Sequence, residues 1–159
     1  MTDAMLDIHP MRRDELAAIL DIAHTAGWAR AFKDDYASMG GRAEHHDVRV
    51  ATVEGQVAGF CEGRFGSDFT AYGAPDHCPV PHAFVGFLAV HQTHRRAGIG
   101  RALLLSYAAD AKARGCSFLG LRLDESGDDA QRLAFFQSLG LTMVNTRSHL
   151  WGAPIIDLV

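Results

Sequence analysis

The chain has 159 residues, of which 48% are hydrophobic and 21% charged, an ordinary globular composition with enough apolar material for one real core. Its formal net charge of -4 excludes broad, non-specific binding to nucleic acid, which needs a basic surface. No apolar run approaches the ~20 residues of a membrane span, and the first seven residues lack the basic stretch and apolar run typical of a secretory leader. Three cysteines without a Cys-x-x-Cys spacing argue against a disulfide framework. We therefore expect one cytoplasmic domain over residues 1–159 that contacts neither membrane nor nucleic acid. Assembly into a homodimer is an alternative that the sequence leaves open.

Hydrophobic periodicity and turn residues predict that strands and helices alternate along the chain. Apolar residues at spacings of three and four mark helices, and Glu54-Gly55-Gln56 between two apolar runs marks a hairpin. The expected strands are 6–9, 48–53, 57–65, 84–90, 118–123, 141–150 and 155–159, and the expected helices are 14–23, 102–114 and 130–139, with 29–43 as a further helix or a loop. The strand–helix–strand unit 84–123 implies a parallel pair of strands.

The most informative segment is Arg95-Arg96-Ala97-Gly98-Ile99-Gly100-Arg101, between an expected strand and an expected helix. A helix N-terminus carries unpaired N–H groups and a partial positive charge, so it favours Asp or Glu rather than three arginines. Cations gathered there indicate a missing anion, most commonly a phosphate, and the glycines let it approach the backbone closely. A solvated turn leaves the charges unexplained, and a Rossmann dinucleotide site needs a tighter turn and a glycine where Leu103 stands.

Two side chains are candidate general bases, Glu62 and His82. Strand alternation puts His82 on the same face as Phe84, and an imidazole is suited to proton transfer near neutral pH; the alternative is an exposed histidine at a strand start. Glu62 lies amid apolar residues of the neighbouring strand, where burial would suit it to base chemistry; the alternative is a solvated face. A metal site at His77, Cys78 and His82 lacks a second ligand pair, so no metal is expected, and Cys78 lacks a partner that would activate it as a nucleophile.

The order of elements and two motifs resemble the GCN5-related N-acetyltransferases, the GNAT family. Leu88-Ala89-Val90 followed by Arg95-x-x-Gly98-x-Gly100 is similar to the family signature Gln/Arg-x-x-Gly-x-Gly/Ala, and Phe135-Phe136-Gln137-Ser138-Leu139-Gly140-Leu141 is similar to Phe-Tyr-x-x-x-Gly-Phe. The resemblance implies an α/β fold, a mixed, mostly antiparallel sheet of about seven strands flanked by about four helices. It also implies an acyl-CoA-dependent N-acyltransferase that moves acetyl from acetyl-CoA to the primary amine of a small molecule or peptide, by direct attack in a ternary complex.

The resemblance assigns roles to residues of both motifs. The backbone from Arg96 to Arg101 would hold the pyrophosphate of coenzyme A, the strand end would bond its pantetheine arm, and the Val90 amide would act in catalysis by facing the thioester oxygen. Asp129 stands where the family often has an asparagine that contacts the arm. The residues that would bind coenzyme A are Leu88, Ala89, Val90, Arg95, Arg96, Ala97, Gly98, Ile99, Gly100, Arg101, Asp129 and Phe136.

Two positions depart from the family pattern. Phe136 stands where many members have a tyrosine that protonates the leaving thiolate, and Phe84 stands where some have a glutamate base. The base role would then fall to Glu62, to His82 or to water, and the thiolate, whose reference pKa is only ~8.5, could leave without assistance. These departures keep two alternatives open: a non-catalytic acyl-CoA-binding sensor module, and a transferase that uses another donor such as succinyl-CoA. The acceptor site is expected in segments 24–45 and 66–82, which carry no motif.

Overall fold

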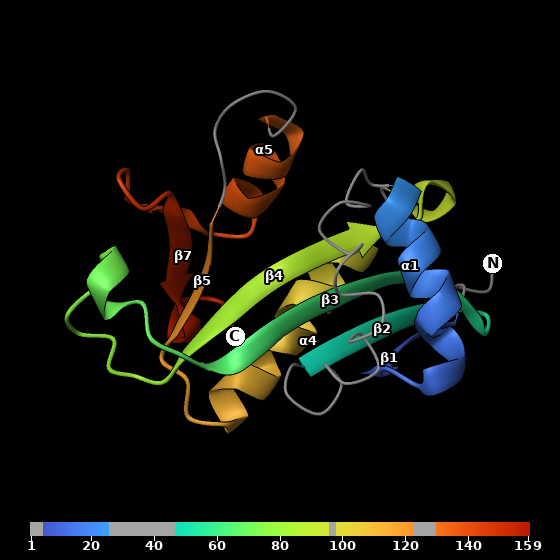
Figure 1. Ribbon diagram of the computed structural model, residues 1–159, viewed down its shortest axis with the longest axis horizontal. Coiled ribbons are helices and arrows are strands. Elements are labelled where there is room, and N and C mark those ends of the chain that lie inside the picture. Colours follow the sequence, from blue (N-terminus) through green and yellow to red (C-terminus); the bar gives the residue numbers. More distant parts are fainter. Residues whose placement is uncertain (1–4, 26–46, 96–97, 123–129) are drawn as a thin grey trace. The chain divides into compact units, whose positions relative to one another are not determined.

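A computed structural model describes residues 5–25, 47–95, 98–122 and 130–159 (Figure 1). Its strands and α-helices are, in chain order, β1 (Leu6–Pro10), α1 (Leu16–Thr25), β2 (Asp47–Val53), β3 (Gln56–Ser67), β4 (His82–Val90), α4 (Ile99–Ala113), β5 (Phe118–Arg122), α5 (Ala130–Ser138), β6 (Thr142–Asn145) and β7 (Leu150–Pro154). The strands form one seven-stranded sheet in the order β1-β2-β3-β4-β5-β7-β6.

The sheet is mixed, as the sequence predicts. The ladders β1–β2, β2–β3, β5–β7 and β6–β7 are antiparallel, whereas β4 and β5 pair in parallel through Ala83–Leu119 and Phe84–Gly120. A parallel pair needs a long crossover, and α4 supplies it. The α/β class is thus confirmed, with three α-helices rather than four in the described part of the chain; the expected element 29–43 lies outside it.

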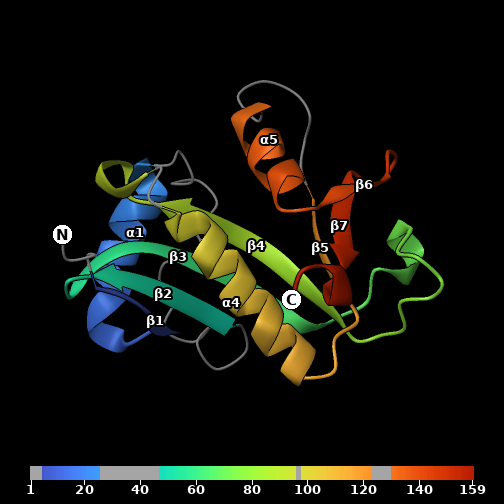
Figure 2. The same cartoon turned by 180° about the vertical axis from the view of Figure 1, so that it is seen from behind.

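The contacts divide the chain into two compact units, one made of Met1–Gly63 and Phe87–Ser106 and the other of Arg64–Gly86 and Tyr107–Val159. A single domain over residues 1–159 therefore stays a prediction. In the first unit, α1 and the first turns of α4 lie against opposite faces of β2 and β3, as the two opposed views show (Figures 1 and 2). Consecutive residues of β3 face opposite sides of the sheet. Phe60 packs in the cluster with α1, while a Cβ on Gly59 would lie 3.3 Å from Leu103 of α4.

The core of the first unit joins the buried face of α1 to the sheet. Its buried members are Ile19, Ile22, Ala23, Val48, Val50, Phe60 and Ala89. Gly59 lets β3 approach β4 here, because a Cβ would lie 2.7 Å from the Ala89 carbonyl oxygen. The β2–β3 hairpin turns on two residues, Glu54 and Gly55, with φ of 52° and 82°, which is the tight two-residue geometry rather than the three-residue turn that the sequence suggests.

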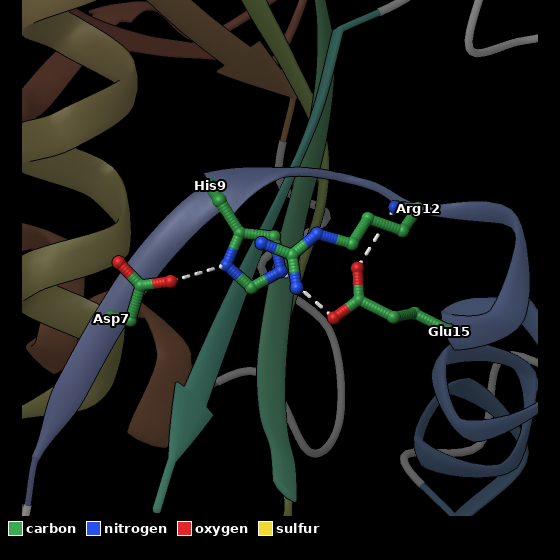
Figure 3. A network of polar contacts seen from close by, with 4 residues as sticks. All are labelled: Asp7, His9, Arg12 and Glu15. Carbon is green, nitrogen blue, oxygen red and sulfur yellow. Dashed lines mark hydrogen bonds and ion pairs between the residues drawn. The ribbon is translucent and has the colours of Figure 1, made fainter. Parts of the chain in front are cut away.

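A polar network centred on the buried His9 and Glu15 ties β1 to the turn before α1 (Figure 3). His9 Nδ1 lies 2.8 Å from Asp7 Oδ2, and its Nε2 lies 2.8 Å from Glu15 Oε2. The second carboxylate oxygen of Glu15 accepts the Arg12 N–H at 2.8 Å, which satisfies a backbone donor where the helical segment begins.

The second unit corrects the sequence analysis at the C-terminus. The predicted strand 141–150 is broken after Asn145, whose Oδ1 accepts the N–H groups of Arg147 and Ser148 at 2.9 and 3.2 Å in an Asx turn. The closing strand is β7, residues 150–154, and not 155–159, because Pro154 ends the ladder and Ile155–Asp157 forms a 3-10 turn.

Candidate active site

The segment that the sequence analysis expects to hold an anion (the anion cradle) lies at the start of α4, and its binding role stays a prediction. The helix begins at Ile99 rather than at Ala102, because the Gly98 carbonyl already accepts the Ala102 N–H at 3.0 Å. Gly98 is exposed and left-handed, with φ of 78°, and a Cβ built on it would meet nothing within 4 Å. Arg95 and Arg101 are exposed, and α4 has no acidic residue in its first turn. First-turn N–H groups have no partner within their helix, so this end can receive an anion. Arg96 and Ala97 lie outside the described residues.

The end of β4 precedes this helix start in the chain, with the 3-10 helix Gln92–His94 between them. Ala89 is buried, while Leu88 and Val90 are half-buried. The His91 N–H donates to the Ala58 carbonyl at 2.7 Å, which holds the strand end against β3. Arg95 Nε approaches the Val90 carbonyl oxygen at 3.4 Å, a long contact. The binding roles of this strand end and of the Val90 amide stay predictions.

Glu62 is buried, with 2% of its surface exposed, so the alternative of a solvated face is wrong. It lies on β3 opposite Val48 of β2, and alternation gives it the face of Phe60, which packs in the cluster with α1. A buried carboxylate is suited to proton transfer, but the role of Glu62 as a base stays a prediction.

His82 is also buried, and its ring is fully engaged. The expectation of an exposed histidine is wrong, because His82 has 0% exposure. The Phe69 N–H donates to Nδ1 at 2.8 Å, and Nε2 lies 2.8 Å from the Cys78 carbonyl oxygen. An amide only donates and a carbonyl only accepts, so the proton resides on Nε2 and the lone pair of Nδ1 is occupied. His82 thus pins the loop after β3 to β4. Its role as a base stays untested, and in this arrangement it would require breaking the bond from Phe69.

The remaining candidates of this loop have no arrangement suited to catalysis. His77 is exposed, whereas Cys78 is buried, and burial together with the nearby Asp157 charge raises the pKa of the Cys78 thiol. A raised pKa disfavours the thiolate that a nucleophile needs. Among the described residues, no group of three or more His, Cys, Asp or Glu side chains could hold a metal ion.

The second motif has a structural explanation. The Leu141 N–H donates to the Phe136 carbonyl at 3.1 Å and the Gly140 N–H donates to that of Gln137 at 3.0 Å, which is the Schellman cap of a helix C-terminus. Gly140 has the φ of 98° that this cap needs, and the Phe136 ring is buried, with 2% exposure. The role of Phe136 in binding coenzyme A stays a prediction, and Asp129 lies outside the described residues.

One polar group was not singled out in the sequence. Arg122, the last residue of β5, contacts Tyr72 of the loop before β4 and Ser148 of the β6–β7 turn. These residues are widely separated in the chain, so no local pattern joins them; a lone arginine ending an apolar strand is the only sequence signal.

Comparison with known proteins agrees with the fold. The chain matches the Acetyltransferase (GNAT) family over residues 13–141, which is most of its length, and it belongs to that family. Among curated proteins, no sequence matches the chain. No helix of the described residues is long and apolar enough to cross a membrane.

Solved structures of acetyltransferases share the fold at low sequence identity. PaiA N-acetyltransferase from Thermoplasma acidophilum, in complex with coenzyme A, is 13% identical with a TM-score of 0.72, and the match covers 94% of this chain and 99% of that one. An acetyltransferase from Streptococcus agalactiae is 13% identical with a TM-score of 0.71, covering 94% and 98%. The ribosomal-protein-S18-alanine N-acetyltransferase from Escherichia coli is 21% identical with a TM-score of 0.68, covering 95% and 94%. At these identities the likeness concerns the fold alone.

Proposed function

We propose that the chain transfers an acetyl group from acetyl-CoA to a primary amine, and that it binds the pyrophosphate of acetyl-CoA at the start of α4. The observation that carries the proposal is the exposed helix start, where Gly98 leaves open space and no acidic residue offsets the positive end of the helix. Arg95 and Arg101 would add charge-assisted hydrogen bonds to the phosphate oxygens. PaiA N-acetyltransferase, which shares the fold, is known in complex with coenzyme A.

In the proposed acetyl transfer, backbone groups bind and polarise the donor, and one side chain takes the proton of the amine. Acetyl-CoA supplies the activated acetyl group. The strand end 88–90 would bond the pantetheine arm, and the Val90 amide would donate to the oxygen on which negative charge develops. Holding donor and acceptor together in a ternary complex supplies proximity and orientation.

The acceptor amine must lose a proton before it attacks. An alkylamine with a reference pKa of ~10.4 is almost wholly protonated at pH 7, so the site needs a proton acceptor or a path to water. His82 could accept a proton at Nδ1 only by breaking the hydrogen bond from the Phe69 N–H, whereas Glu62 is a buried carboxylate in the same unit as the strand end 88–90. We assign the proton to Glu62, directly or through a water molecule.

The cradle can be tested with a matched pair of glycine substitutions. Gly98→Asp puts a carboxylate where the anion should lie, and we expect the Kd for acetyl-CoA, measured by calorimetry, to rise by at least tenfold. Gly55→Asp is the control: Gly55 is also exposed, left-handed with φ of 82° and free of neighbours within 4 Å, but it lies in the β2–β3 turn. Equal affinity in both variants would refute the cradle.

One observation supports a second function, that of a non-catalytic acyl-CoA sensor. The engaged ring of His82 and the phenylalanines at positions 84 and 136 leave few acid–base groups, as in a non-catalytic acyl-CoA sensor. A panel of amines, with release of the coenzyme A thiol as readout, separates the two functions. Binding of acetyl-CoA without thiol release on any amine favours the sensor, and release only with succinyl-CoA would change the donor.

A further inference from the structure

His91 stands between the two parts of the proposed acetyl-CoA site, the strand end 88–90 and the start of α4. It follows the last residue of β4 and is followed by the 3-10 turn Gln92–His94. All these elements belong to the first compact unit. The His91 N–H donates to the Ala58 carbonyl of β3 at 2.7 Å, and its own carbonyl accepts the His94 N–H at 2.8 Å. One residue therefore joins the strand to the turn.

The His91 ring is the N-cap of this turn. Its Nδ1 accepts the Thr93 N–H at 3.2 Å and lies 2.7 Å from the Thr93 hydroxyl oxygen. An amide nitrogen only donates, so Nδ1 must carry a lone pair and the ring proton resides on Nε2. The hydroxyl can reverse its role in the hydrogen bond, but the amide cannot. The cap therefore exists only while the His91 imidazole is neutral, whereas the usual N-caps Ser, Thr and Asn carry no charge at any pH in this range.

Protonation of the ring would add a positive charge where cations already gather. Two titratable or charged side chains belong to the turn itself: His94, whose ring centre lies 6.2 Å from that of His91, and Arg95, the C-cap. The neighbouring strand β3 meets His91 with its backbone, and α4 brings Arg101 in its first turn. These side chains are cations or become cations as pH falls, so they would repel an imidazolium at this position.

We propose that His91 is a positioning residue whose neutral ring holds the strand end 88–90 and the start of α4 in the geometry that binds acetyl-CoA, so that acetyl-CoA binding weakens when His91 is protonated. The inference rests on the proposed acetyl-CoA site and adds a response to pH. Protonation turns the Nδ1 acceptor into a donor that faces the Thr93 N–H, and the turn loses its cap. Histidine is the side chain that ordinarily changes its charge between about pH 5 and 8, so the response falls in a physiological range.

The sign of the pH effect separates this role from a simple effect of charge. An imidazolium close to the phosphates of acetyl-CoA would attract them, and affinity would then rise as pH falls. Loss of the cap has the opposite effect, and losing a side-chain N-cap typically costs about fivefold in the equilibrium that it supports. We therefore expect the Kd for acetyl-CoA to rise by about fivefold between about pH 7.5 and about pH 5.5, relative to a variant whose cap does not titrate.

Calorimetry with acetyl-CoA at these two pH values tests the proposal on three variants. His91→Asn is the informative one, because the asparagine Oδ1 can accept the Thr93 N–H at both pH values. It should bind acetyl-CoA like wild type at the higher pH and lack the additional weakening at the lower. His91→Ala, which has no cap, should bind about fivefold more weakly at both. His94→Asn is the matched control: it removes a histidine of the same turn that is not the cap, and it should keep the wild-type response.

Each outcome decides the proposal. Titration of the acetyl-CoA phosphates is common to all variants, so an equal pH response in wild type and His91→Asn overturns the proposal, and so does an affinity that rises at acidic pH through His91. A response that disappears in His94→Asn instead assigns the titrating group to His94 and overturns the role of His91. Nitrogen-15 NMR of the ring is an independent measurement, and a proton on Nδ1 at neutral pH would contradict the cap. If wild type binds no acetyl-CoA, the proposed function fails together with this inference, whereas binding with equal pH responses defeats the inference alone.

Discussion

Replacing His82 by phenylalanine should cost a large part of the stability of the protein. The ring volume is nearly kept, but two backbone groups lose their partners, the Phe69 N–H and the Cys78 carbonyl, both at buried residues. Each unpaired buried group costs about 1–3 kcal/mol, so the expected loss is about 2–6 kcal/mol. A domain of this size loses roughly 2–4 °C of Tm per kcal/mol, which predicts a fall of about 4–24 °C.

Urea denaturation and thermal melting measure this loss, with His77→Phe as the control. His77 is exposed, so the same substitution there should stay within about 0.5 kcal/mol of wild type. Hydrogen exchange at the Phe69 amide should accelerate in His82→Phe. A loss below about 1 kcal/mol would refute the reasoning, because two unsatisfied buried groups cannot cost so little.

The conservative variant His82→Gln separates a structural role from a catalytic one. A glutamine amide can both donate and accept, so it can restore part of the two hydrogen bonds. If His82 only positions the loop, His82→Gln should recover stability and keep kcat within a few fold. A general base typically contributes ~10²–10⁴ in rate, so a loss of that size at nearly normal Tm would return the base role to His82.

Three further outcomes are expected. Glu62→Gln should lower kcat by about 10²–10⁴, and a kcat within a few fold of wild type would assign the proton to water or to another group. Gly152→Ala should destabilise the protein by about 1–3 kcal/mol in urea, because an added Cβ would overlap the backbone of β5, and a neutral effect would contradict this packing. Burial raises the pKa of the Cys78 and Cys116 thiols from 9.0, so their stabilising effect is complete below that pH and is lost as pH rises. Iodoacetamide at pH 8 should alkylate them more slowly than in the unfolded chain, and equal rates would be the contrary result.

The elements that could be predicted from the sequence are those with a local signal. Apolar spacing predicts α1, the glycine at position 140 predicts the end of α5, and the alternation of strand, helix and strand predicts the parallel pair β4–β5. The C-terminal strands were misplaced because apolar residues run on through Ile155 and Ile156, whereas the ladder ends at Pro154. Composition alone does not reveal where pairing stops.

The side-chain environments could not be predicted, because their partners are distant in the chain or belong to irregular backbone. The ring of His82 is hydrogen-bonded by an amide and a carbonyl of the loop after β3. Both are backbone groups, so the residue types of the loop do not reveal them. The Arg122 contacts join three segments. The exposed start of α4 is the exception, because a helix start exposes its own backbone and requires no distant partner; whether it binds an anion stays a prediction.

The two motifs behind the family resemblance differ in what their glycines do, and this difference can be measured. Gly140 serves a Schellman cap, so Gly140→Ala should cost about 1–2 kcal/mol of stability, through its left-handed φ of 98°, and leave the Kd for acetyl-CoA unchanged. Gly98 has a similar φ of 78° but no neighbour within 4 Å, so packing does not require a glycine there. If the space is kept for an anion, Gly98→Ala should weaken acetyl-CoA binding in addition to a similar loss of stability. Equal loss of stability in both variants with unchanged affinity in both would mean that the open space at Gly98 belongs to the fold and not to the ligand.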